Sequence, residues 1–420
     1  MTGWKEAIES EWKRRRGGEE HRWRFPLIAQ GFDSREIIDA VDVLLSGRIT
    51  MGERVAEFER RFASIVGAPH AVMVNSGSSA NLLAVSALVN PARAGALSRG
   101  DEVLVPAVCW PTSIWPAIQL GLKAVFVDVD PSTLNMSMDD LRRKLTSRSR
   151  AVMAVHILGN SSPMDELLDI ARAHGLKLIE DTCESLGSRA GAKTLGTSGD
   201  FGTYSFYYSH HITTGEGGMV VCATQEDDDL LRCLRAHGWS RELSNRSEVQ
   251  AANPDIDPRF LFVNTGYNVR PTEVAAAFGL RQLERLATMN ATRNRNLARL
   301  RETLLAHPRW HDQIEFPRPS PRTEPAWFGA PMLLAERFAA RKQLYLDYLT
   351  SHGVENRPIV SGNFARQPAL HLLGVDLDPA DFPGAERVGR CGFFIGLHTE
   401  PIEESDITML ADILLGYELD

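Results

Sequence analysis

The sequence is poor in the residues and runs that build disulfide frameworks, metal clusters and membrane spans. Its 420 residues include five cysteines, which are widely spaced and form no CxxC or CxC pair. We therefore expect neither a disulfide framework nor a bound zinc or iron–sulfur centre. No stretch approaches the ~18 consecutive apolar residues of a membrane-spanning helix, and residues 1–24 lack the apolar run of a signal peptide. These absences favour a cytoplasmic protein with no membrane partner.

An excess of positive charge is also missing. The chain has 46 Lys and Arg residues against 54 Asp and Glu residues, and its net charge of −8 argues against a general nucleic-acid binder. Hydrophobic residues make up 43% and charged residues 24%, as in ordinary globular proteins. A chain of this length is expected to form about two or three domains.

From about residue 32 the chain alternates short apolar strands with helical stretches. The strands are continuously apolar, as expected of strands buried on both faces of a mostly parallel sheet. They are residues 71–75, 102–106, 124–128, 151–156 and 177–181. This pattern predicts an α/β fold in which functional side chains lie at the carboxyl ends of the strands.

The character of the sequence changes after Pro271. Residues 272–305 predict one long helical stretch, and the remaining chain predicts a smaller α/β unit. We expect three parts, which are an N-terminal arm (1–31), a large domain (32–290) and a small C-terminal domain (291–420).

The segment NSGSSA at residues 75–80 follows a strand and opens a helix. Its small residues let the backbone approach a phosphate, and the helix N-terminus supplies amide donors, so Gly77 and Ser78 are candidate phosphate contacts. A capped strand-to-helix turn without a ligand would look the same.

In two further segments, a predicted strand is followed directly by side chains that can take part in binding or catalysis. KLIEDTCE at residues 177–184 places Asp181 and Glu184 after a buried strand, and Trp110 follows the strand at 102–106. The plain alternatives are an acidic helix cap and a core tryptophan.

The segment SFYYSHHITTGEGG at residues 205–218 carries two adjacent histidines, His210 and His211, before a glycine-rich turn. Histidine suits proton transfer near neutral pH. Because the two residues are adjacent, we expect their side chains to diverge.

Together these segments resemble the DegT/DnrJ/StrS family of pyridoxal-phosphate (PLP) sugar enzymes from about Phe32 to the C-terminus. The resemblance implies a fold-type I PLP-dependent transferase, similar to aspartate aminotransferase. It implies that Asp181 holds the pyridine nitrogen, Trp110 stacks on the ring and Ser205 binds the phosphate. Glu184, which follows the same strand as Asp181, is a candidate to approach the ring hydroxyl. GYNVRPTE at residues 266–273 resembles a family segment whose Asn, here Asn268, reaches the phosphate of the neighbouring subunit, which implies a homodimer with shared sites.

The family pattern has a lysine where this chain has His210. A lysine would bind the cofactor covalently, whereas histidine can only move protons. This departure is similar to the sugar 3-dehydratases, as are the segments at residues 156–160, 237–241, 357–364 and 393–396. Within that subgroup, the absence of a CxC favours the metal-free kind, which uses L-glutamate and a GDP-linked sugar. His237, Arg241 and Arg357 are candidates for binding the anionic substrates, although surface ion pairs are the plain alternative.

The resemblance implies a reaction in two halves. Glutamate converts PLP to its amine form, PMP, which stays bound without a covalent anchor. PMP then condenses with the C4 ketone of a nucleotide-linked 4-keto-6-deoxy sugar. His210 removes a proton and assists loss of the C3 hydroxyl, and a 3-deoxy ketosugar, ammonia and PLP are released.

Other interpretations stay open. They are an iron–sulfur 3-dehydrase, an aminotransferase using Lys177 or Lys193, and a catalytically silent PLP-fold binding protein. The sequence does not fix the nucleotide, because GDP, CDP and dTDP sugars present the same two phosphates, and the sugar could also be nucleoside-linked.

Overall fold

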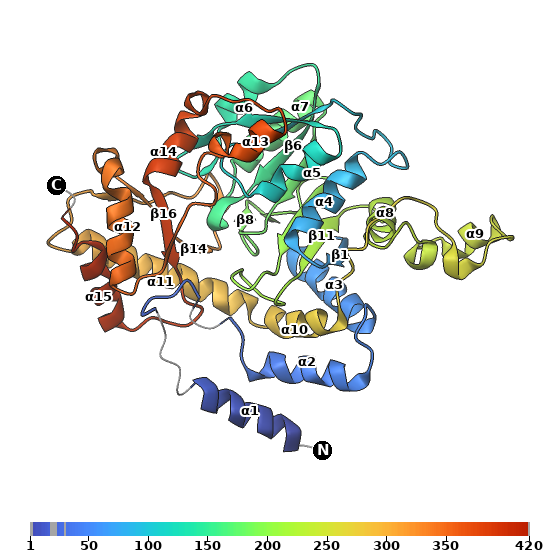
Figure 1. The fold of residues 1–420 in the computed structure, drawn as a ribbon, viewed down its shortest axis with the longest axis horizontal. Coiled ribbons are helices and arrows are strands. Elements are labelled where there is room, and N and C mark those ends of the chain that lie inside the picture. Colours follow the sequence, from blue (N-terminus) through green and yellow to red (C-terminus); the bar gives the residue numbers. More distant parts are fainter. Residues whose placement is uncertain (1–2, 17–22, 29–30, 419–420) are drawn as a thin grey trace.

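The computed structural model describes residues 3–16, 23–28 and 31–418 (Figure 1). Its central feature is a seven-stranded sheet in the order β1-β11-β10-β7-β6-β2-β3. All the strands run parallel except β11, which is antiparallel to both of its neighbours. The strand bounds are β1 His70–Val74, β2 Glu102–Pro106, β3 Lys123–Val127, β6 Ser149–Val155, β7 Lys177–Asp181, β10 Phe201–Ser205 and β11 Gly218–Cys222. The predicted α/β fold with a mostly parallel sheet is confirmed, and the expected strands end within two residues of these bounds.

Helices bury both faces of this sheet, which explains why its strands are continuously apolar. Val72 and Val74 pack in a cluster with α4 (Gly77–Leu88), whereas Met73 between them packs with α3 (Glu53–Val66) and α10 (Glu273–Leu283). Successive side chains of a strand point to opposite faces, so a strand covered on both sides needs apolar residues throughout. The other helices at this sheet are α5 Trp115–Gln119, α6 Met138–Lys144, α7 Met164–His174 and α8 Gln225–Arg235.

A second, four-stranded antiparallel sheet is built from the C-terminal part of the chain. Its order is β12 (Ile314–Glu315), β14 (Gly329–Leu334), β16 (Gly392–Gly396) and β15 (Asn356–Pro358). It shares a core cluster with residues of α11 (Leu286–Ala306), α12 (Lys342–Ser351) and α15 (Glu404–Leu414). The N-terminal segment joins this unit, because Phe25 is buried in the same cluster and bridges to Val354.

The long helical stretch expected over residues 272–305 is helical along almost all of its length. The stretch forms two helices, α10 and α11, which are separated at Glu284 and Arg285. The domain boundary that we expect near residue 290 falls close to the start of α11 and stays a prediction. Among the described residues, no helix is both long enough and apolar enough to cross a membrane.

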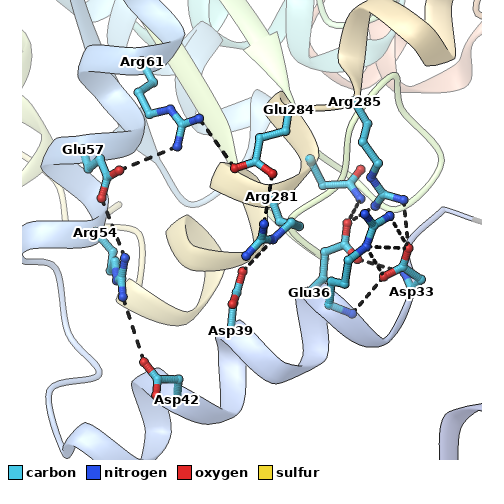
Figure 2. Close-up of polar contacts among 12 residues, drawn as sticks. Asp33, Glu36, Asp39, Asp42, Arg54, Glu57, Arg61, Arg281, Glu284 and Arg285 are labelled. Atoms are coloured by element: carbon cyan, nitrogen blue, oxygen red, sulfur yellow. Dashed lines mark hydrogen bonds and ion pairs between the residues drawn. The ribbon is translucent and has the colours of Figure 1, made fainter. Parts of the chain in front are cut away.

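Two separate groups of polar contacts fasten α2 (Ser34–Ser46) to α3 and to the end of α10 (Figure 2). In the first group Glu36 is fully buried, pairs with Arg285 and accepts a hydrogen bond from Gln282 Nε2 at 2.7 Å. The Gln282 Oε1 atom accepts from the Thr213 backbone N–H at 3.2 Å. This group therefore reaches the turn that follows His210. The second group is exposed or partly exposed and joins Asp39, Asp42, Arg54, Glu57, Arg61, Arg281 and Glu284.

Candidate active site

A cavity of about 520 Å³ opens at the carboxyl ends of the parallel strands and extends to the small sheet. Strand ends supply one wall, and residues of β15, β16 and the N-terminal segment supply the other. Eight of the sequence-predicted site residues line it, and they are Gly77, Ser78, Trp110, Asp181, Glu184, Ser205, His210 and Arg357. The fold therefore brings together most of the residues that the sequence singled out.

The turn before α4 has the shape of an anion cradle. Ser76 caps the helix, its Oγ accepting the Ser79 backbone N–H at 3.1 Å. Gly77 packs so closely on the end of β10 that a Cβ atom would lie 2.5 Å from the Cβ of Ser205. Small residues at the start of α4 and at the end of β10 thus bring serine hydroxyls and the N-terminal amides of a helix to one place, which suits a phosphate group.

Asp181 ends β7 and is buried at the base of the cavity. Its Oδ2 accepts hydrogen bonds from Asn81 Nδ2 and Ser113 Oγ, both at 2.7 Å, and its Oδ1 accepts the Cys183 N–H at 3.2 Å. These donors fix the orientation of the carboxylate. A fixed, buried carboxylate suits a protonated ring nitrogen, as the pyridine of PLP requires.

His210 faces the cavity between the rings of Tyr207 and Phe328, whose centroids lie 5.9 and 5.3 Å away. Its buried Nδ1 has no hydrogen-bond partner among the described residues. Burial lowers the pKa of His210 to about 4, although Asp181 opposes this shift and Arg293 adds to it. The imidazole is therefore neutral at physiological pH and able to accept a proton.

His211 points away from the cavity, as expected. Its Nε2 lies 2.8 Å from the Ala326 carbonyl oxygen, and the side chain is buried. The adjacent histidines thus differ in role, one facing a cavity and the other packed in the interior.

Glu184 shares the cavity with Asp181 and is held by the Leu158 backbone N–H, which donates to its Oε2 at 3.0 Å. Burial raises the pKa of Glu184 to about 7, and the nearby charge of Asp181 adds to this rise. A carboxyl group that is protonated part of the time can donate as well as accept a hydrogen bond.

Three predicted residues do not line this cavity. Asn268, His237 and Arg241 are exposed. Asn268 Oδ1 accepts from Arg270 Nε at 3.0 Å, and the Arg241 guanidinium lies 3.9 Å from the ring centroid of Trp239. Their binding roles stay predictions, and any role at a cavity would have to be at that of another subunit.

The structure adds cavity residues that sequence reasoning missed, among them His156, Cys183, Arg293, Phe328, Leu27 and Ile28. His156 is buried, receives the Ser162 N–H on Nδ1 and lies 3.3 Å from Glu180 through Nε2. Arg293 had a readable signal, because it interrupts the apolar stripe of a helix at a spacing of four residues from Met289 and Leu297. Among the described residues, no group of three His, Cys, Asp or Glu side chains is placed to hold a metal ion.

Comparisons with known proteins agree with this geometry. The model of the DegT/DnrJ/EryC1/StrS aminotransferase family matches residues 32–412. GDP-4-keto-6-deoxy-D-mannose 3-dehydratase of Yersinia pseudotuberculosis is 37% identical over 383 residues, which are 90% of this chain and 95% of that protein.

Solved structures agree as well. The E. coli GDP-4-keto-6-deoxy-D-mannose-3-dehydratase with bound hydrated PLP superimposes with a TM-score of 0.87 at 35% identity, covering 94% of this chain and all of that one. A structure of GDP-4-keto-6-deoxymannose-3-dehydratase with a trapped PLP-glutamate geminal diamine gives a TM-score of 0.85 at 35% identity, covering 93% of this chain and 100% of the other.

Proposed function

This chain belongs to the DegT/DnrJ/EryC1/StrS aminotransferase family, and from that we propose that it is a PLP-dependent sugar 3-dehydratase. Its substrate is a nucleotide-linked 4-keto-6-deoxyhexose, with GDP as the nucleotide, and L-glutamate is the amino donor. The observation that carries this proposal is His210, which stands in the cavity where the family's aminotransferases have lysine. The proposal is further supported by the similarity to proteins named as 3-dehydratases and by the bound PLP and glutamate adduct in their structures.

The residues of the cavity fit the cofactor. When bound, PLP supplies an electron sink that lets a proton be removed from a neighbouring carbon. Gly77, Ser78 and Ser205 hold its phosphate, Asp181 holds its ring nitrogen and Trp110 covers its ring. No side chain in this arrangement would anchor the cofactor covalently, so noncovalent contacts would retain it.

His210 moves the proton. Its imidazole lines the cavity and its pKa is lowered to about 4, so it can take up a proton and then deliver it to the departing C3 hydroxyl, which leaves as water. Glutamate supplies the two electrons that the sugar gains. The balanced reaction converts the 4-keto-6-deoxy sugar and glutamate into the 3,6-dideoxy ketosugar, 2-oxoglutarate and ammonia.

The homodimer with shared sites is part of the proposal. Asn268, His237 and Arg241 are exposed, so they are free to reach the cavity of a second subunit. There Asn268 would meet the cofactor phosphate, while His237 and Arg241 would meet anionic groups of the substrates, with Arg357 contributing from within the same chain.

Mass spectrometry of products tests the reaction. The protein is incubated with PLP, glutamate and a panel of 4-keto-6-deoxy sugars linked to GDP, CDP or dTDP. A product lacking one oxygen, with 2-oxoglutarate and ammonia in equal amounts, is expected with the GDP sugar. An amine in place of the ketone would assign an aminotransferase instead, and turnover only with an added electron donor and iron would assign the iron–sulfur type.

A further inference from the structure

Arg293 is a cation on the buried face of a helix. Its neighbours along the stripe of α11 are Leu286, Met289, Leu297 and Leu300, which are all buried, and Arg293 itself is only 4% exposed. Burying a charged group without a partner is costly, so a buried arginine normally faces a carboxylate.

The described residues give Arg293 no such partner. Its Nη1 makes two long contacts of 3.4 Å, with the His211 carbonyl oxygen and with Asn290 Oδ1. Its buried Nε has no hydrogen-bond partner, and no carboxylate of the described chain pairs with it. Burial lowers the pKa of Arg293 to about 10, so the guanidinium stays charged at neutral pH. Arg293 therefore brings to the cavity wall a positive charge with which no carboxylate of the described residues pairs.

The charge of the other arginine that lines the cavity is already paired with a carboxylate. Arg357 is exposed, and its Nη2 lies 2.8 Å from Glu355 Oε1. Its charge is already balanced within the chain, whereas that of Arg293 is not. Of the two arginines, Arg293 has the stronger need for an anion from outside.

We propose that Arg293 binds a carboxylate of the amino-acid co-substrate, and this inference rests on the proposed function. The cofactor phosphate has its own cradle at Gly77 and Ser205. A sugar nucleotide carries its diphosphate in the middle of a larger molecule, which cannot reach a nearly buried cation. A carboxylate is a terminal group of planar shape that can accept two parallel N–H bonds from the guanidinium.

This assignment also links binding to proton transfer. Arg293 is close enough to lower the pKa of His210. A carboxylate bound to Arg293 offsets that effect and lets His210 hold a proton more readily, so binding of glutamate raises the basicity of the group that must remove the proton.

The test measures binding without turnover. Glutarate has the two carboxylates of glutamate but no amine, so it cannot react with the cofactor. Calorimetric titration of the PLP-loaded protein should show glutarate binding, and Arg293→Gln should weaken it by about tenfold or more. The neutral analogue glutaramide should bind to neither protein.

Arg301 provides the matched control. It lies on the same helix and its Nε is also unpaired, but its guanidinium is over Phe316 and Trp327 and it does not line the cavity. Arg301→Gln should leave the glutarate affinity unchanged. If Arg293→Gln does not fold, Arg293→Lys keeps the charge but loses the two-pronged geometry, and about a tenfold loss is expected there.

Two outcomes would overturn the inference. One is a wild-type protein that binds no glutarate, and the other is an affinity that is unchanged in whichever Arg293 variant folds. The two proposals can also fail separately. If the wild-type protein binds glutarate and the Arg293 variant does not, but the wild-type protein turns over no sugar, the carboxylate site is supported and the dehydratase is refuted.

Discussion

Among single residues of the site, His210 is the one whose side chain and surroundings most directly restrict it to proton transfer. It is neutral, it lies against two aromatic rings, and its Nδ1 is left without a partner. A lysine in the same place would be a nucleophile as well as a base. The residue type at position 210 therefore decides whether the site can attach the cofactor covalently or can only transfer protons.

His210→Lys should restore covalent attachment. We expect borohydride reduction of the PLP-loaded variant to leave a cofactor adduct on residue 210, found by peptide mass spectrometry, and the product mixture to gain an aminosugar. His210→Asn should show no adduct, and its activity should be reduced by about 10²-fold or more. If the lysine variant carries no adduct, residue 210 does not face the cofactor in the way proposed.

Glu184→Gln should change how stability depends on pH. The folded-state pKa of Glu184 is about 7, above its ordinary value of 4.5. Below pH 4.5 the carboxyl is protonated in both folded and unfolded chains. As pH rises from 4.5 to 7 the unfolded chain ionises first, so wild type loses stability relative to the glutamine variant. The difference should reach about 3 kcal/mol and then stay constant.

Urea denaturation of the cofactor-free proteins at several pH values measures this difference. Acidification also charges His210, whose folded-state pKa is lowered to about 4, but that contribution is common to both proteins and cancels. A difference that is flat from pH 4.5 to 7 would contradict the assignment of Glu184 as a half-buried, partly protonated group.

At the scale of elements, the junction of α2 with α10 connects stability to the site. Glu36 and Gln282 are buried, and Gln282 bonds to the backbone of Thr213 in the turn that follows His210 (Figure 2). The hydrogen bonds of this junction leave the turn little freedom to shift away from the cavity.

Glu36→Ala should destabilise the fold by about 3 kcal/mol, because it leaves Arg285 and Gln282 without their shared acceptor. Asp42→Ala is the control on the same helix, α2. Its ion pair with Arg54 is 4.0 Å long and exposed, so its removal should cost less than about 1 kcal/mol. Urea midpoints of the two variants give the comparison, and equal midpoints would show that the buried pair contributes no more than a surface pair.

Elements also show what the sequence could and could not predict. The strands β2 and β7 have the expected bounds because a run buried on both faces leaves an unbroken apolar signal. The break between α10 and α11 at Glu284 and Arg285 left no proline or glycine to mark it. The position of Arg293 in an apolar stripe can be read from the sequence, but that it lines the cavity without a carboxylate partner is shown only by the folded chain.

At the scale of the whole molecule, the position of Asn268 allows a monomer to be distinguished from a dimer with shared active sites. Asn268 is exposed and does not line the cavity of its own chain. In a monomer it would be an ordinary surface residue, with no effect on catalysis. In the proposed dimer each cavity is completed by Asn268 of the neighbouring subunit, so every active site takes His210 from one chain and Asn268 from the other.

Mixing two inactive variants distinguishes these architectures. His210→Asn and Asn268→Ala should each be inactive or nearly so as homodimers. In a hybrid dimer one site carries both substitutions, while the other has an intact His210 from one chain and an intact Asn268 from its partner. Refolding equal amounts together yields hybrids as about half of all dimers, each with one working site, so about a quarter of wild-type activity should return. Refolding each variant alone supplies the control. If no activity returns although native mass spectrometry detects the hybrid, Asn268 acts within its own subunit or not at all, and the shared site must be abandoned.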